Sequence, residues 1–268
     1  MGGMPKPAMA PEPRLNLLGV RVSAVNLQSA ADRILRAVEG RMKGYVCIRD
    51  VHGVVKCQHD EKLRQAHREA FLVTPDGMPV VWSLRLAGHA DVSRVYGPDL
   101  MLALFDQGQA KGVRHYLYGS TPETLSKLED RLAKRFPEAE IVGSYSPPFR
   151  DLTEAEKGDV ARQIDESGAD IVWVGLGTPR QELWMAEMRD LIDAPIFIGV
   201  GAAFDFHAGV KAQAPRVIQR SGFEWLFRVA CEPRRLLPRY AVAVPTFLFL
   251  GFGQLLGRPQ PSIDPADG

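Results

Sequence analysis

Short apolar runs alternate with amphipathic stretches along most of the chain. The runs are rich in Ile and Val and are continuous, as expected for strands whose two faces are both covered by helices. This order of elements predicts an α/β fold, a Rossmann-like and mostly parallel sheet with helices on both faces, followed by a short C-terminal helical appendage. The predicted strands are 45–48, 71–74, 115–118, 141–143, 171–175 and 196–200.

Proline marks both ends of the predicted folded part, because seven of the 20 prolines lie in the first 13 or the last ten residues. We expect a disordered leader over 1–15, one α/β domain over 16–233, a basic and apolar membrane-associating appendage over 234–257, and a disordered tail over 258–268. The leader lacks the apolar core of a secretory signal. The longest apolar run, 240–256, is interrupted by one proline and two glycines and is too short to span a membrane.

Two helix starts are predicted directly after strands that end in glycine. Ser120 stands three residues before Glu123, which is a capping-box pattern, and Thr178 stands three residues before Gln181 in the same way, with proline at the first helical position. Ligands bind at the carboxyl edge of such sheets, and the N–H groups of helix starts favour phosphate. The turn glycines Gly119, Gly175 and Gly177 are therefore candidate substrate-binding residues.

The glycine turns do not complete a dinucleotide fingerprint, since Gly177 is followed by Thr-Pro-Arg and Gly201 by Ala-Ala-Phe. A nicotinamide-dependent oxidoreductase is thus disfavoured. The six histidines show no zinc-binding spacing and there is no Asp-x-Asp pair, so we expect no metal site and no cofactor. If a diphosphate is bound, arginines and backbone N–H groups must balance its charge.

The net charge becomes informative when the C-terminal part of the chain is counted separately from the rest. The total of +1 argues against nucleic acid as a partner, but residues 207–268 carry eight Lys or Arg and only four Asp or Glu. These basic residues are interleaved with aromatic and aliphatic ones, which is typical of helices on an anionic membrane surface, although a core helix with a solvated basic face has the same pattern. Three scattered cysteines favour a reducing compartment.

Several polar residues at strand exits could carry chemistry. Asp76 follows a predicted strand and precedes a predicted helix, so it could act as a general base or simply cap that helix. Gln181 and Glu182 could bind sugar hydroxyls, although Gln181 could instead complete the capping box. Asp205, between two phenylalanines, could accept a hydrogen bond from a base or ribose, or cap the next turn.

Seven short motifs follow one another between residues 74 and 235. They are TPDGMP (74–79), RVYGPDL (94–100), GLGTPRQE (175–182), GVGAAFDFHAG (199–209), AP (214–215), EWLFR (224–228) and EPRR (232–235). In this order and spacing they resemble the WecG/TagA/CpsF family of bacterial glycosyltransferases, over about residues 45–240.

The resemblance implies an enzyme, a hexosyltransferase that moves a sugar from a UDP-sugar donor to a sugar on undecaprenyl diphosphate, with inversion and without a metal. Relatives transfer N-acetylmannosamine or N-acetylmannosaminuronic acid, and others serve exopolysaccharide, capsule, teichoic acid or surface antigen synthesis. The implied location is cytoplasmic, peripherally on the inner face of the cell membrane, with homo-oligomers left open. The alternative is a non-catalytic UDP-binding assembly protein of the same fold.

The resemblance also implies roles for individual residues. Asp76 becomes the catalytic base, and the tail arginines are implied to close over the diphosphate. The family often carries Thr-x-Asn where this chain has Ile48-Arg49-Asp50, so Asp50 becomes a second candidate acid or base. The remaining substrate-binding candidates are Arg94, Gly97, Asp99, Gly175, Gly177, Gln181, Glu182, Gly201, Asp205, Arg228, Arg235 and Arg239.

Overall fold

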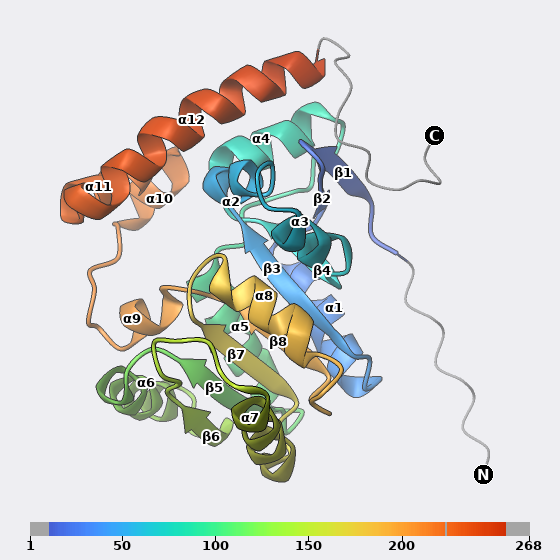
Figure 1. Ribbon diagram of the computed structural model, residues 1–268, viewed down its shortest axis with the longest axis vertical. Coiled ribbons are helices and arrows are strands. Elements are labelled where there is room, and N and C mark those ends of the chain that lie inside the picture. Colours follow the sequence, from blue (N-terminus) through green and yellow to red (C-terminus); the bar gives the residue numbers. More distant parts are fainter. Residues whose placement is uncertain (1–10, 223, 256–268) are drawn as a thin grey trace.

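The computed structural model describes residues 11–222 and 224–255, and it confirms the predicted α/β fold (Figure 1). Six strands form one sheet in the order β4-β3-β8-β7-β5-β6, and every neighbouring pair is parallel. Each strand matches one of the six predicted runs. They are β3 (Gly44–Arg49), β4 (Leu72–Pro75), β5 (Arg114–Gly119), β6 (Glu140–Tyr145), β7 (Ile171–Gly175) and β8 (Ile196–Gly199).

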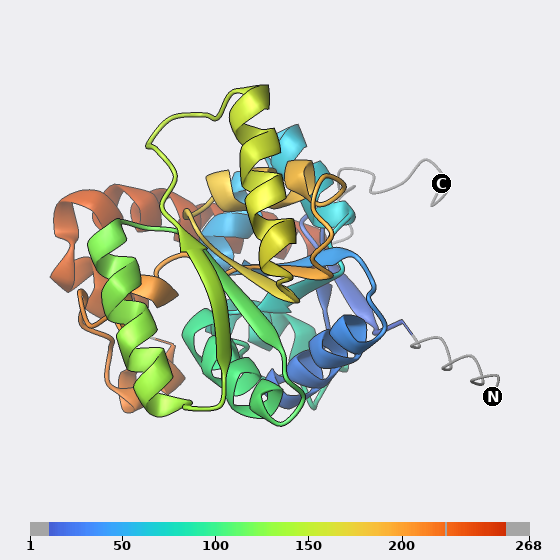
Figure 2. The ribbon, with the colours of Figure 1, turned by 90° about the horizontal axis from the view of Figure 1, so that it is seen from below.

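Helices cover both faces of the sheet (Figure 2). Because successive side chains of a strand point to opposite faces, Val172 and Val174 enter one core cluster, whereas Ile171 and Trp173 enter the other. The first cluster is closed by α2 (Val51–Lys56), α3 (Glu61–Arg68), α4 (Met78–Leu86), α7 (Glu154–Ser167) and α8 (Arg180–Met188). The second is closed by α1 (Leu27–Glu39), α5 (Gly97–Gln109), α6 (Pro122–Arg135) and α9 (Ala203–His207).

A small antiparallel hairpin precedes the sheet and was not predicted. It consists of β1 (Arg14–Leu17) and β2 (Val20–Ser23), joined at Leu18 and Gly19, which both have positive φ. The hydroxyl of Ser23 accepts a hydrogen bond from the Val73 amide, which ties the hairpin to β4. The first strand thus begins within the predicted leader. The predictions for residues 1–10 and 256–268 lie outside the described residues.

Both predicted capping boxes are wrong. The cap of α6 is Thr121, whose Oγ1 accepts from the Thr124 amide, because the cap directly precedes the proline that opens the helix. Helix α8 begins at Arg180, and its cap Pro179 has no side chain that can accept a hydrogen bond. The Thr178 hydroxyl instead donates to Glu182 at 3.1 Å. Both helices nevertheless start at the carboxyl edge of the sheet, as predicted.

Three helices end the described chain: α10 (Arg216–Ser221), α11 (Glu224–Cys231) and α12 (Pro233–Leu255). Helices α11 and α12 pack through Val229, Leu236 and Tyr240. Helix α12 runs across α2 (Figure 1), and its Ala243 and Phe247 join the same core cluster as the residues of α2. Of the helices in the described ranges, none has the length and apolar character required to cross a bilayer.

Candidate functional site

Two pockets meet at the carboxyl edge of the sheet. The glycine pocket has a volume of about 450 Å³, and its walls include Gly97, Gly175, Gly177, Gln181, Gly201 and Asp205. The C-terminal pocket, of about 120 Å³, lies between the sheet domain and the last helices, and its walls include Met78, Pro79, Glu224, Trp225, Tyr240 and Val244. Asp50, Asp76 and Arg228 line both pockets, so these three predicted site residues stand at their junction.

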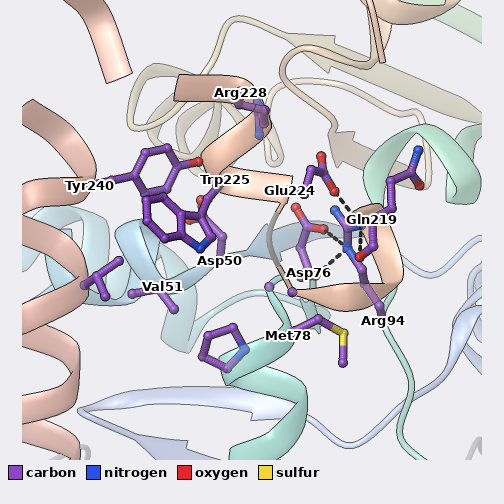
Figure 3. Close-up of a pocket in the computed structure, with 14 residues that line it drawn as sticks. Asp50, Val51, Asp76, Met78, Arg94, Gln219, Glu224, Trp225, Arg228 and Tyr240 are labelled. Carbon is purple, nitrogen blue, oxygen red and sulfur yellow. Dashed lines mark hydrogen bonds and ion pairs between the residues drawn. The ribbon is translucent and has the colours of Figure 1, made fainter. Parts of the chain in front are cut away.

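A chain of ion pairs fixes Asp76 at this junction (Figure 3). The Nε of Arg94 donates to the Asp76 Oδ1 at 2.9 Å and to the Asp76 backbone oxygen at 2.7 Å. The Nη1 of Arg94 lies 2.6 Å from the Glu224 Oε2, on helix α11. The guanidinium also lies over the Tyr96 ring, 4.0 Å from its centre. Arg94 therefore joins the sheet domain to the C-terminal helices and orients Asp76.

The second carboxylate oxygen of Asp76 differs from the first, which Arg94 holds. No group in the described part of the chain donates a hydrogen bond to its Oδ2, and the side chain is 18% exposed. Burial raises the pKa of Asp76 from 3.8 to about 6; Arg94 opposes this shift, and the carboxylates of Glu224 and Asp50 add to it. A carboxylate with such a pKa is a better proton acceptor at neutral pH than an ordinary aspartate.

Asp76 does not cap the following helix, which was the alternative interpretation. The cap of α4 is Gly77, and no side chain caps the helix start. Asp50, in contrast, is a cap: its Oδ1 accepts from the Gly53 amide at 2.8 Å at the start of α2. Asp50 thus has a structural role, and it also lines both pockets.

Gln181 and Glu182 are neighbours with different surroundings. Gln181 lines the glycine pocket, where its Oε1 accepts from the Gly177 amide at 3.2 Å. Glu182 is fully buried beneath the pocket, and its Oε1 accepts from Thr178 and from Gln181 and pairs with Arg49. Glu182 therefore supports residues of the pocket wall through hydrogen bonds and does not line the pocket itself.

Arg49 is the residue of this network that the sequence analysis did not assign to the site. It lies at the end of β3 with 1% of its side chain exposed. An arginine in an otherwise apolar strand is the signal that could have found it, because a buried charge needs a partner. That partner is 133 positions away in the chain, so the sequence pattern alone does not reveal it.

Glycine is required where the strand ends approach each other. A Cβ on Gly119, whose φ is +125°, would lie 2.7 Å from the Gly175 backbone, and a Cβ on Gly175 would lie 2.7 Å from the Phe204 ring. Gly119 is not part of the glycine pocket's wall, so its role is to let β5 and β7 come close.

Basic side chains enter the site from the C-terminal part of the chain. Arg228 lines both pockets, with its guanidinium 5.8 Å from the centre of the Phe206 ring. Lys211, which the sequence analysis did not single out, pairs with Asp205 at 2.9 Å and also lines the glycine pocket. The side chains of Arg235 and Arg239 lie outside the described part of the structure.

Asp99 is a further predicted site residue that lines neither the glycine pocket nor the C-terminal pocket. It lines a neighbouring cavity together with Arg135 and Arg216, and this cavity shares Arg94 and Gln219 with the C-terminal pocket. Across residues 11–222 and 224–255, no three His, Cys, Asp or Glu side chains gather as ligands for a metal ion.

The structure thus shows an α/β fold with a glycine-lined pocket at the carboxyl edge of its sheet and the carboxylates of Asp50 and Asp76 where that pocket meets a second one. The chain belongs to the Glycosyl transferase WecG/TagA/CpsF family, whose family model matches residues 15–261. This confirms the resemblance seen in the motifs. The protein is therefore a glycosyltransferase, and its family implies a part in cell-surface polysaccharide synthesis, with a sugar-nucleotide donor and a lipid-linked acceptor.

Proposed function

We propose that this enzyme transfers N-acetylmannosamine, N-acetylmannosaminuronic acid or a related hexose from a UDP-sugar to a sugar on undecaprenyl diphosphate. The observation that carries the proposal is the position of Asp76 where two pockets of different character meet. The larger glycine pocket is suited to the nucleotide sugar. The C-terminal pocket, next to the apolar face of the last helices, is suited to the acceptor.

The glycine pocket offers what a diphosphate needs. The turn glycines Gly177 and Gly201, both with positive φ, line this pocket without side chains, and Arg228 and Lys211 bring positive charge. Asp205 stands on the same wall as a hydrogen-bond acceptor for a ribose or base. These groups support binding of UDP without a bridging metal ion, in line with the family resemblance.

The C-terminal pocket offers a surface for a sugar ring. Trp225 and Tyr240 lie with their ring centres 5.8 Å apart, and Val244 continues the wall. Aromatic side chains present large apolar faces and also polar edges, which suits the mixed character of a sugar. An acceptor sugar against these rings has its hydroxyls close to Asp76.

The proposed reaction is a direct displacement. The Asp76 Oδ2 takes the proton of an acceptor hydroxyl while that oxygen bonds to the anomeric carbon of the donor sugar. The bond from that carbon to the UDP oxygen breaks on the opposite face, so the configuration inverts and UDP leaves with the electron pair. Arg228 stabilises the negative charge that develops on the diphosphate, assisted by Arg235 and Arg239 as the resemblance implies.

A panel of donors and acceptors tests this function. The purified enzyme is offered UDP-N-acetylmannosamine, UDP-N-acetylmannosaminuronic acid and other UDP-hexoses, each with a short-chain lipid-diphosphate sugar, and products are detected by mass. We expect one pair to give a product heavier by one sugar residue. Tight UDP binding without transfer in any pair would contradict the proposal and favour the non-catalytic assembly protein.

The proposed location, on the inner membrane face, rests on the surface of α12. Leu237, Val242, Leu248 and Phe249 are between 56% and 68% exposed and recur along α12. An exposed apolar strip beside basic residues is typical of helices that lie in an anionic membrane surface.

The double variant Leu237→Gln with Val242→Gln is therefore expected to bind anionic phospholipid vesicles about tenfold or more weakly, since two apolar side chains lose their lipid contacts. Co-sedimentation with vesicles measures this. Leu191→Gln is the matched control, because Leu191 is similarly exposed (53%) and lies outside α12. Equal binding by all three proteins would remove α12 from the membrane contact.

A further inference from the structure

Another cavity lies at the far end of helices α4 and α12 and takes no part in the site described above. Its volume is about 370 Å³, within the range of small-molecule pockets, and its walls are mainly apolar. The residues that matter here are Leu15 and Leu17 of the hairpin, Leu86 and Ala87 at the end of α4, and Phe247, Leu248 and Gly251 of α12. We call it the hairpin groove.

The hairpin groove is held together across the length of the chain. The side chain of Gln254, on α12, donates to the Asn16 backbone oxygen at 2.6 Å and accepts from the Leu18 amide at 3.1 Å. The last turns of α12 are therefore fixed to the β1–β2 turn, more than 230 positions earlier. The C-terminal end of α12 is therefore held in place and forms one wall of the groove.

The polar groups of the groove are already engaged within the protein. The Ser83 hydroxyl donates to the Pro79 oxygen at 2.9 Å, and the Asn16 Oδ1 accepts from the Gly19 amide at 2.8 Å. Both halves of the Gln254 amide are used as described above. A ligand of the groove thus meets mostly hydrocarbon, although Leu86 on its rim is 85% exposed to water. Such a surface is suited to an apolar chain and not to a polar one.

The groove and the C-terminal pocket lie along the same two helices. Met78 and Pro79 at the start of α4 and Tyr240 and Val244 of α12 line the C-terminal pocket. Leu86 and Phe247, further along these helices, line the groove. Eight residues of helix separate Met78 from Leu86, which corresponds to about 12 Å.

We infer that the hairpin groove binds the first isoprene units of the lipid carrier of the acceptor. This inference rests on the proposed function, in which the acceptor is a sugar joined through a diphosphate to an isoprenoid chain. The sugar and the hydrocarbon of that molecule follow each other in the same order as the C-terminal pocket and the groove do along α4 and α12. Leu248, exposed beside the groove, continues the apolar surface toward the membrane.

Gly251→Leu blocks the groove without disturbing the rest of the protein. A Cβ added at Gly251 meets no atom within 4 Å, and leucine is a better helix former than glycine, so the variant is expected to fold. Gly158→Leu is the matched control: Gly158 lies inside α7, far from the groove, and a Cβ there also meets nothing within 4 Å.

Binding of farnesyl diphosphate and of inorganic pyrophosphate is measured by calorimetry for all three proteins, in detergent-free buffer. We expect the wild type and Gly158→Leu to bind farnesyl diphosphate about tenfold or more tightly than pyrophosphate, because two or three buried methylene groups suffice for that factor. Gly251→Leu should lose this preference and bind pyrophosphate unchanged. In transfer assays, its KM should rise for a long-chain acceptor but not for the UDP-sugar.

The two proposals fail in different ways. If the wild type shows no preference for farnesyl diphosphate, or if Gly251→Leu keeps that preference, the groove does not bind the isoprenoid. If the preference is present and sensitive to Gly251→Leu but no sugar is transferred in the panel, the groove stands and the proposed reaction is wrong. Weaker vesicle binding by Gly251→Leu together with unchanged farnesyl diphosphate binding would make the groove a membrane contact instead.

Discussion

Replacing Asp76 by Asn is expected to lower sugar transfer by about 10²- to 10⁴-fold while UDP still binds, because a positioned general base contributes about that factor. Transfer is measured by product mass and UDP binding by calorimetry. The variant should melt no lower than the wild type. Burial disfavours the charged form of Asp76, so a neutral side chain of the same shape removes an unfavourable charge and leaves Arg94 paired with Glu224.

Asp106→Asn is the control, since Asp106 is exposed on α5 and lines neither pocket of the site. It should transfer sugar at the wild-type rate. A fully active Asp76→Asn would remove Asp76 from the mechanism, and Asp50, the other carboxylate at the junction of the pockets, would then be the base to test.

The raised pKa of Asp76 gives a second check on the same role. The base must be ionised, so kcat/KM of the wild type should fall about tenfold per pH unit below pH 6, where an ordinary aspartate would hold activity down to about pH 4. The residual activity of Asp76→Asn should not show this decrease below pH 6.

The stability of the folded protein should change in the opposite direction to kcat/KM as the pH falls. Because the folded-state pKa is the higher one, protonation of Asp76 as the pH falls through 6 favours the folded state.

Glu182→Gln is expected to destabilise the protein by about 3–5 kcal/mol, because it leaves the charge of Arg49 buried without its partner. For a chain of this size that corresponds to a loss of about 10 °C in Tm, measured by thermal unfolding. UDP affinity should change little at a temperature where the variant is folded. Unchanged stability with lost UDP affinity would instead place Glu182 in contact with the substrate.

Two further variants isolate the buried pair. Glu187→Gln, on the same helix, breaks a half-exposed ion pair with Lys157 and should cost no more than about 1 kcal/mol. Replacing both buried partners, by Arg49→Met with Glu182→Leu, should recover most of the stability lost in Glu182→Gln, since no unpaired charge remains. No recovery would mean that the hydrogen bonds of Thr178 and Gln181 to Glu182 carry the stability instead.

Sequence pattern was sufficient for the sheet because most of its strands are short apolar runs that are buried on both faces, and the half-buried edge strand β6 still contains a short apolar segment. It was insufficient for the hairpin, where only Leu15, Leu17, Val20 and Val22 alternate with polar residues over two four-residue strands. The starts of α6 and α8 were each misplaced by one residue, since several side chains near a helix start could cap it and the structure uses only one or none.

For the site, the motifs identified candidate residues but did not reveal the contacts between them. Arg94, Asp76 and Glu224 all lie in motifs, yet nothing in their spacing shows that one arginine holds both carboxylates. Glu182 and Asp99 lie in motifs too, and the structure puts the first beneath the glycine pocket and the second in another cavity. The residue types in a motif indicate which chemistry a protein can perform. Burial and hydrogen-bond partners determine whether a particular side chain lines the site or supports it from the interior.

The ion pair between Arg94 and Glu224 also has a consequence for synthesis of the protein. Asp76 and Arg94 lie in the first half of the chain, whereas Glu224, Trp225 and Tyr240 follow only in its last fifth. Chains fold from the N-terminus as they are made, so the sheet can form while the C-terminal pocket is still incomplete. The enzyme is therefore expected to acquire activity only at the end of translation, when its last helices dock.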